Sequence, residues 1–323
     1  MCHDESLAVE RAVFVPDIDR VPPPGEPYDR LYLGSEFCAW RLPGKRELGG
    51  AHAFAARRGM TFSLVTPFLG ELDLARTLDL VRALPADPSA EVVANDIGLI
   101  EALRAAGWKG TVVAGRLLTR QRRGPGFQSF GDIPPEAAEA LRGSALDAPG
   151  FVELLGAQYG VRRFELDDLV QGTAVPPLPA GVSLSLYRPF LLVTATRICP
   201  WVFDGRTWDR SRGCGRPCRG HVIRLVPVEA AGSSRCAPPS CSPQPAERDH
   251  EPPRRMGCVA QSSRMGESEG VRSERPPAPG TGAARTPARP LVLGGCAQFL
   301  ENRSDAPPPP GVDRIVWQPQ VPA

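Results

Sequence analysis

The sequence predicts an α/β fold, a complete or partial βα barrel of parallel strands. Between residues 28 and 228, short apolar runs typical of strands alternate with amphipathic segments typical of helices. Successive strand-like runs are spaced by roughly 25 to 30 residues, the repeat of βα units in a parallel sheet. A doubly wound sheet is the alternative, because it is built from the same units. With 323 residues and 42% hydrophobic content, the chain is large enough to form the core of either fold.

The first half of the predicted domain repeats the strand–helix unit most clearly. The run TFSLVT is rich in residues that favour strands and is stopped by Pro67. In segment 71–84, leucine and valine side chains fall on one helical face opposite charged residues. Gly107 ends the next amphipathic segment. The predicted elements are strands at 30–34, 61–66, 91–94 and 111–115, alternating with helices at 51–58, 71–84 and 97–106.

The second half of the domain continues the alternation after a polar, glycine-rich loop at 120–132. The next helix begins at Pro134, because proline is tolerated in the first turn of a helix. Upstream of the domain, residues 1–27 are assigned to a polar N-terminal extension, in which VFVP is strand-like and the prolines at 22–24 prevent a helix or central strand. The remaining predicted elements are helices at 134–142 and 151–159 and strands at 161–166, 182–187 and 191–194.

Residues 229–290 differ sharply in composition from the rest of the chain. They contain eleven prolines and nine arginines but no Leu, Ile, Phe, Tyr or Trp. Such a segment cannot bury enough apolar surface to offset the entropy lost on ordering, so we expect it to be disordered. It is either a true insertion or the product of a shifted reading frame. Residues 291–323 contain strand-like runs again, at 290–294 and 313–317, and are expected to return to the main domain.

Polar side chains follow the predicted strands at the ends where βα loops begin. In a parallel sheet these ends share one rim, which is where functional groups collect. Carboxylates at such positions can transfer protons, but Asn95 or Asp96 would also cap the helix that begins at Ile97, and we favour capping for these two. The residues expected on this rim are Glu36, Cys38, Asn95, Asp96, Arg116, Glu165 and Asp167.

Three cysteines, Cys199, Cys214 and Cys218, lie close together in an arginine-rich stretch. Thiols so clustered, in a chain without a recognisable secretory signal, indicate metal binding rather than disulfides. We expect the neighbouring guanidinium groups to favour the thiolate form. A tetrahedral site needs four ligands, so a fourth comes from elsewhere in the chain. Zinc is one alternative, because Cys214, Cys218 and His221 have a C-x3-C-x2-H spacing that zinc tolerates.

Charge and hydropathy argue against nucleic acids and membranes as binding partners of this chain. The chain has 38 Lys and Arg against 36 Asp and Glu, a net charge of +2, which argues against a large nucleic-acid-binding or membrane-binding surface. No apolar run approaches the roughly 20 residues of a membrane span. The first fifteen residues lack the charged and apolar regions of a signal peptide. We therefore expect a cytoplasmic protein.

Five segments of the sequence form a recognisable set: DRLYLGSEFCAWR, TFSLVTP, EVVANDIGLIEAL, VVAG and the cysteine trio in the spacing C-x14-C-x3-C. Together they resemble the collagenase-like peptidase family U32, and in particular its iron–sulfur branch of the UbiU/UbiV type. The resemblance implies that Cys38, Cys199, Cys214 and Cys218 bind one [4Fe–4S] cluster. It also implies a role in oxygen-independent hydroxylation in ubiquinone biosynthesis, with a homologous family member as the partner in a hetero-oligomer.

The same resemblance leaves two other functions open, a peptidase and an RNA base hydroxylation factor. The histidine-containing signature of the peptidase branches, ending in HG-x-x-C, does not occur here, nor do the G-x-S-x-G and H-E-x-x-H motifs. The near-neutral charge argues against RNA, although the arginines near Cys214 offer a local phosphate-binding surface. Catalytic residues are not identified. The other cysteines are predicted to be bystanders: Cys2, Cys236, Cys241, Cys258 and Cys296.

Overall fold

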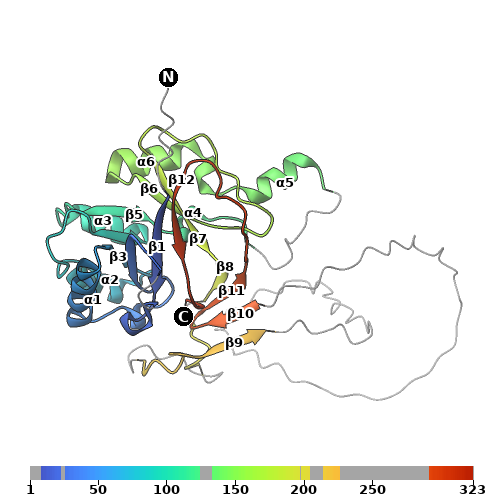
Figure 1. The fold of residues 1–323 in the computed structure, drawn as a ribbon. Coiled ribbons are helices and arrows are strands. Elements are labelled where there is room, and N and C mark those ends of the chain that lie inside the picture. Colours follow the sequence, from blue (N-terminus) through green and yellow to red (C-terminus); the bar gives the residue numbers. More distant parts are fainter. Residues whose placement is uncertain are drawn as a thin grey trace, which may run out of the picture. The chain divides into compact units, whose positions relative to one another are not determined.

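Parallel strands close into a barrel in the computed structural model, which describes residues 9–22, 26–123, 133–196, 198–203, 214–225 and 291–322 (Figure 1). Every neighbouring pair of barrel strands is parallel, so the predicted βα barrel is confirmed in its complete form. Around the barrel, the eight strands of the described residues are β1 (Glu10–Val15), β12 (Val312–Trp317), β7 (Ser183–Arg188), β6 (Arg163–Asp167), β5 (Thr111–Ala114), β4 (Glu91–Ala94), β3 (Thr61–Val65) and β2 (Arg30–Gly34).

Most helices lie on the outside of the barrel and bury apolar side chains against it, but the helix at 135–142 has no buried residue (Figure 1). The first helix begins at Lys45 rather than at residue 51, because Glu47 accepts from the N–H of Gly44 at 2.7 Å and Leu48 is buried. This gain outweighs the poor helix propensity of Gly49 and Gly50. The helices are α1 (Lys45–Arg57), α2 (Glu71–Val81), α3 (Ile97–Ala105), α4 (Arg116–Thr119), α5 (Pro135–Arg142) and α6 (Pro149–Tyr159), with short 3-10 turns η1 (Ile18–Arg20), η2 (Ala39–Arg41) and η3 (Ala145–Asp147).

The two ends of the chain meet in the barrel wall, where β1 pairs with both β2 and β12. Residues 10–15 therefore belong to the barrel and not to an extension outside it. Their pattern alternates: Ala12 and Phe14 pack inside the barrel, whereas Val13 and Val15 belong to the core outside it. Both faces are buried, which is how a strand of a parallel barrel is stabilised.

A second, antiparallel sheet lies over the loops that follow β2 and β5. Its strand order is β8 (Phe190–Ala195), β11 (Ala297–Glu301), β10 (Leu291–Gly294) and β9 (Val222–Leu225). Apolar side chains of β8 and β11, among them Leu192 and Phe299, pack against Phe37 of the loop after β2 and Leu117 of α4. The sheet thus covers the carboxyl ends of barrel strands, where the sequence places the functional groups.

The barrel interior is layered, with an apolar middle between two charged ends. The middle layer contains Phe14, Tyr32 and Tyr187 among smaller side chains. Near the strand starts, Arg314 donates to Glu91 at 2.7 Å and also pairs with Glu10. The buried charges at this end are therefore paired, as burial requires.

The structure does not describe residues 226–290. The prediction that residues 229–290 are disordered therefore concerns residues outside the described ranges. The described residues all belong to one compact unit. Within the described ranges, no helix is both long and apolar enough to cross a membrane.

Candidate functional site

The carboxyl-end layer of the barrel is organised around Arg116, the first residue of α4. Its Nε and Nη2 donate to the two oxygens of Glu36 at 2.8 and 2.5 Å, and its Nη1 donates to Asp167 at 2.6 Å. Arg123 donates to the second oxygen of Asp167 at 2.5 Å. The predicted rim residues Glu36, Arg116 and Asp167 are therefore in direct contact.

Burial and charge act against each other at Arg116. Burial alone would lower the pKa of the guanidinium, but the carboxylates of Glu36 and Asp167 outweigh burial and raise it. The Tyr187 ring adds a cation–π contact, with its centroid 4.2 Å from Arg116 Cζ. The Phe37 and Phe299 rings lie at 5.7 and 5.9 Å. None of the Arg116, Glu36 and Asp167 side chains is exposed, so these ion pairs hold the rim loops together.

The other predicted rim residues have structural roles or remain inside the barrel. Asp96 caps α3 by accepting from Leu99 N at 3.1 Å, which confirms the capping prediction for this residue. Asn95 instead donates to Thr66 O at 2.9 Å and accepts from Leu117 N at 3.0 Å, joining two rim loops. Glu165 is fully buried, and Tyr187 donates to one of its oxygens at 2.8 Å.

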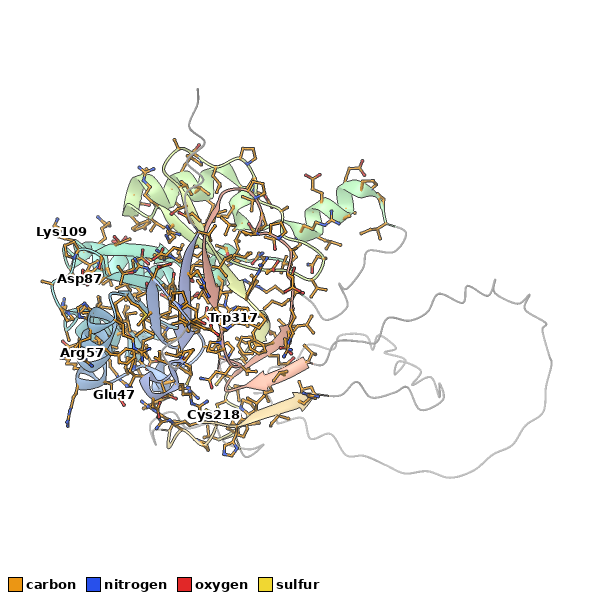
Figure 2. All side chains as sticks on the ribbon, viewed as in Figure 1. Glu47, Arg57, Asp87, Lys109, Cys218 and Trp317 are labelled. Carbon is orange, nitrogen blue, oxygen red and sulfur yellow. The ribbon has the colours of Figure 1, made fainter. Side chains whose placement is uncertain are left out.

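The predicted cysteine ligands come from three separate loops near the second sheet. Cys38 lies between β2 and η2, and Cys199 follows β8. Cys214 and Cys218 precede β9, and Figure 2 shows Cys218 beside the start of that strand. The sulfurs are close enough for the charges of Cys38, Cys199 and Cys218 to raise the pKa of Cys214, although burial is the larger cause. The expectation that arginines favour the thiolate is therefore not met at Cys214, where burial and neighbouring sulfurs prevail.

Cys296, predicted to be a bystander, lies among these thiols. It occupies the turn between β10 and β11, and its thiol forms hydrogen bonds with both Cys38 and Cys199. These bonds lower the pKa of Cys38 to about 7 and that of Cys199 to about 6, against the opposing effect of burial. The pKa of Cys296 itself is raised, because it keeps the proton that it shares. Sequence spacing gave no signal for Cys296, since its position depends on strand pairing across the second sheet.

Each of the four predicted ligand sulfurs accepts N–H hydrogen bonds. Backbone N–H groups of Trp40 and Arg41 donate to Cys38, and those of Trp201 and Val202 donate to Cys199. The remaining two bonds are Arg216 N to Cys214 Sγ at 3.3 Å and Arg41 Nη1 to Cys218 Sγ at 3.6 Å. N–H donors of this kind stabilise thiolates and tune the metal that they bind.

Arg216 joins the cysteine segment to the barrel. Its Nε donates to Trp40 O at 2.9 Å and its Nη2 to Leu42 O at 3.3 Å, so the segment from Cys214 is attached to the loop that follows Cys38. Arg216 belongs to the arginines that the sequence places around the cysteines, whereas the contact of Arg41 with Cys218 was not predicted.

As they stand, the thiols do not form a finished metal site. In the described part of the chain, no group of three or more His, Cys, Asp or Glu side chains has the arrangement needed to hold a metal ion. Two of the sulfurs, those of Cys38 and Cys199, lie instead beside the Cys296 thiol. Their chemistry nevertheless fits a thiolate-bound group, because four sulfurs with N–H donors gather in one region. Cys2, Cys236, Cys241 and Cys258 lie outside the described residues.

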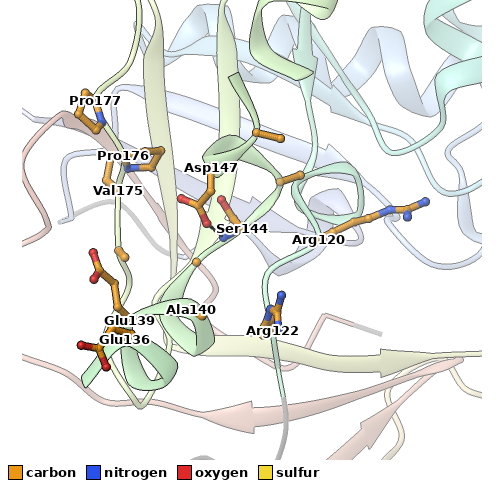
Figure 3. A pocket seen from close by; sticks show the side chains of 14 residues that line it. Arg120, Arg122, Glu136, Glu139, Ala140, Ser144, Asp147, Val175, Pro176 and Pro177 are labelled. Atoms are coloured by element: carbon orange, nitrogen blue, oxygen red, sulfur yellow. Dashed lines mark hydrogen bonds between the residues drawn. The ribbon is translucent and has the colours of Figure 1, made fainter. Parts of the chain in front are cut away.

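A separate pocket of about 880 Å³ opens between the loops that follow β5 and β6 (Figure 3). Arg120 and Arg122 line it together with Glu136 and Glu139 of α5 and the prolines at 176–177. The pocket contains both signs of charge, so it does not select a ligand by charge alone.

No protein-family model and no curated protein matches the sequence. Among solved structures, the chain is similar to that of the U32 peptidase Mk0906, with 15% sequence identity over 62% of this chain and 75% of the other and a TM-score of 0.32. A likeness of this degree carries no functional argument. The barrel assignment rests on the strand order and pairing of the chain itself.

Proposed function

We propose that this chain is an iron–sulfur protein that binds one [4Fe–4S] cluster through Cys38, Cys199, Cys214 and Cys218. The observation that carries the proposal is that these four sulfurs, from three loops, gather in one region and each accepts an N–H hydrogen bond. A cluster with four irons needs one thiolate for each iron. The order of the four cysteines in the sequence, and the resemblance that it carries, support iron over zinc.

The chain's own residues would stabilise the thiolates and exclude water. Cys199 and Cys218 are buried, and Arg41, itself 6% exposed, brings a positive charge to Cys218. Such a charge offsets the repulsion among several thiolates in a small volume. When bound, a cluster of this type supplies one-electron transfer.

We further propose that the protein takes part in oxygen-independent hydroxylation in ubiquinone biosynthesis, together with a homologous family member. What supports a partner is the resemblance to the iron–sulfur branch, which implies a hetero-oligomer.

The test of cluster binding is anaerobic purification followed by iron and sulfide analysis. We expect a brown protein with about four irons and four sulfides per chain. Cys38→Ala should lower the iron content nearly as much as Cys214→Ala, whereas Cys258→Ala, outside the described residues, should leave it unchanged. A colourless protein that contains zinc would overturn the proposal, and so would a Cys38→Ala protein that keeps its full iron content.

The partner is tested by co-expressing the chain with a homologous family member from the same genome. We expect the two to co-purify as a stoichiometric complex and to support hydroxylation without oxygen. If the chain purifies without the partner and keeps its cluster, the hetero-oligomer is ruled out. The proposal of cluster binding is then unaffected.

A further inference from the structure

The turn that carries Cys296 is attached on both sides of Cys199. Thr196 N donates to Cys296 O at 2.9 Å, and Trp201 Nε1 donates to Gly295 O at 2.9 Å. Thr196 precedes Cys199 and Trp201 follows it. These two bonds therefore hold the Cys199 loop against the Cys296 turn without involving either sulfur.

The turn itself is rigid, because β10 and β11 pair up to its edges. Gly294 is paired with Ala297, which leaves only Gly295 and Cys296 between the two strands. Gly295 has φ +55°, a conformation that glycine adopts at little cost. These contacts hold the Cys296 thiol beside the sulfur of Cys199.

We propose that Cys199 and Cys296 form a reversible dithiol–disulfide pair that a hydroperoxide oxidises when no metal occupies the thiol site. Both are free thiols with low exposure, 6% for Cys199 and 7% for Cys296. Four cysteines are enough for the proposed cluster, so Cys296 is available for this second role. The inference rests on contacts within the chain and does not depend on which metal binds, or on whether one binds.

The oxidation is balanced as a two-electron reaction with hydrogen peroxide. The Cys199 sulfur attacks one peroxide oxygen, the O–O bond breaks, and Cys199 becomes a sulfenic acid as the first water leaves. The Cys296 sulfur then attacks the Cys199 sulfur, the S–O bond breaks, and a second water leaves. In sum, two thiols and one hydrogen peroxide give one disulfide and two waters. A dithiol reductant reverses the change through thiol–disulfide exchange.

Cys38 also contacts Cys296, but the backbone contacts favour Cys199 as the partner. The hydrogen bonds of the Cys38 segment run to Ser35 at 3.3 Å and, through Trp40 O, to Arg216 at 2.9 Å. Those contacts tie Cys38 to the barrel and to the Cys214 segment. The two bonds around Cys199 run to the Cys296 turn itself.

The test uses the full-length chain, reduced and freed of metal by a chelator, and treated with a small excess of hydrogen peroxide. Remaining thiols are alkylated with N-ethylmaleimide, and a non-reducing digest is analysed by mass spectrometry. We expect a peptide pair linked through Cys199 and Cys296 as the main disulfide, lost after treatment with dithiothreitol. A main disulfide between Cys38 and Cys296, or alkylation of both Cys199 and Cys296 after oxidation, would overturn the proposal.

Two matched variants test whether the disulfide depends on Cys296 in particular. Cys296→Ser should abolish the linked peptide and increase irreversible oxidation of Cys199 to sulfinic acid at least severalfold, since no second thiol traps the sulfenic acid. Cys214→Ser removes a neighbouring thiol and should keep the linked peptide. Loss of the linked peptide in both variants would mean that the disulfide depends on the whole cluster, which would contradict the pair. If Cys296→Ser does not fold, the wild-type peptide map alone decides.

Discussion

Arg116 and Glu36 lie 80 residues apart in the sequence and form a two-pronged ion pair inside the barrel, with N–O distances of 2.8 and 2.5 Å. Both carboxylate oxygens accept from the same guanidinium, which favours the ionised form, while complete burial acts the other way and raises the pKa of Glu36. The pair joins the loop after β2 to the first turn of α4. With Asp167 on β6, it ties together three barrel strands at the end that carries the thiol site.

The first prediction is that Arg116→Ala destabilises the protein strongly. The change leaves Glu36 and Asp167 buried and close together without their shared cation, which costs about 3–5 kcal/mol of unfolding free energy. Arg104→Ala is the control, because Arg104 forms an exposed pair with Glu101 on α3, and its loss should lower the unfolding free energy far less. Urea unfolding followed by circular dichroism measures both. Equal losses for the two variants would contradict a structural role for Arg116.

The sequence predicted the barrel better than it predicted the second sheet. The strands at 30–34 and 91–94 were predicted at their observed bounds, because buried parallel strands are short apolar runs between polar loops. Because parallel strands end on one rim, the sequence also placed Glu36, Arg116 and Asp167 together there. Their direct contact depends on the side-chain conformations, which the sequence pattern does not specify. The second sheet was not predicted, since β9 and β10 lie on either side of residues 226–290 and pair over a long sequence separation. The position of Cys296 beside Cys38 and Cys199 was not predicted for the same reason.

The second prediction concerns Arg216, which attaches the Cys214 segment to the loop after Cys38 through Trp40 O and Leu42 O. Arg216→Ala should lower iron content severalfold, because the segment is then less well placed to bring its sulfurs together. The unfolding free energy should change by less than about 1 kcal/mol, since the barrel is untouched. Arg219→Ala is the control: its side chain is 50% exposed and pairs with Asp17, so iron content should stay at the wild-type value. Unchanged iron in Arg216→Ala would show that the tether is dispensable.

The third prediction is a pH dependence that originates at Glu165. Burial, with repulsion from Glu36, raises the pKa of Glu165 from 4.5 to about 8, so the folded protein keeps this carboxyl protonated up to that pH. The unfolded chain loses the proton near pH 4.5 and therefore binds fewer protons between pH 4.5 and 8. The contribution of Glu165 to stability is thus complete below pH 4.5 and falls as the pH rises to about 8.

Glu165→Gln should remove this pH dependence while keeping an acceptor for Tyr187. The difference in unfolding free energy between variant and wild type should shift in favour of the variant by on the order of 3 kcal/mol between pH 5 and pH 8. Glu101→Gln is the control: Glu101 is exposed and its pKa is lowered, mainly by the hydrogen bond from Arg104, so its titration lies below this window. Parallel pH profiles for wild type and Glu165→Gln would show that Glu165 does not titrate between these limits.

The last prediction is that removal of the metal loosens the cysteine segment and leaves the barrel intact. Residues 214–225 are held by Arg216, by Arg41 at Cys218 and by the pairing of β9 with β10, and the proposed cluster would add covalent links to Cys38 and Cys199. Barrel strands β2 to β4 each pair with neighbours on both sides and do not depend on those links. Hydrogen exchange compared between cluster-containing and chelator-treated protein should therefore show at least tenfold faster exchange in peptides from 214–225, with no change in peptides from β3 and β4. Because local opening reports the free energy of each region separately, equal loss of protection in β3 would show that the metal site supports the whole fold rather than its own loop.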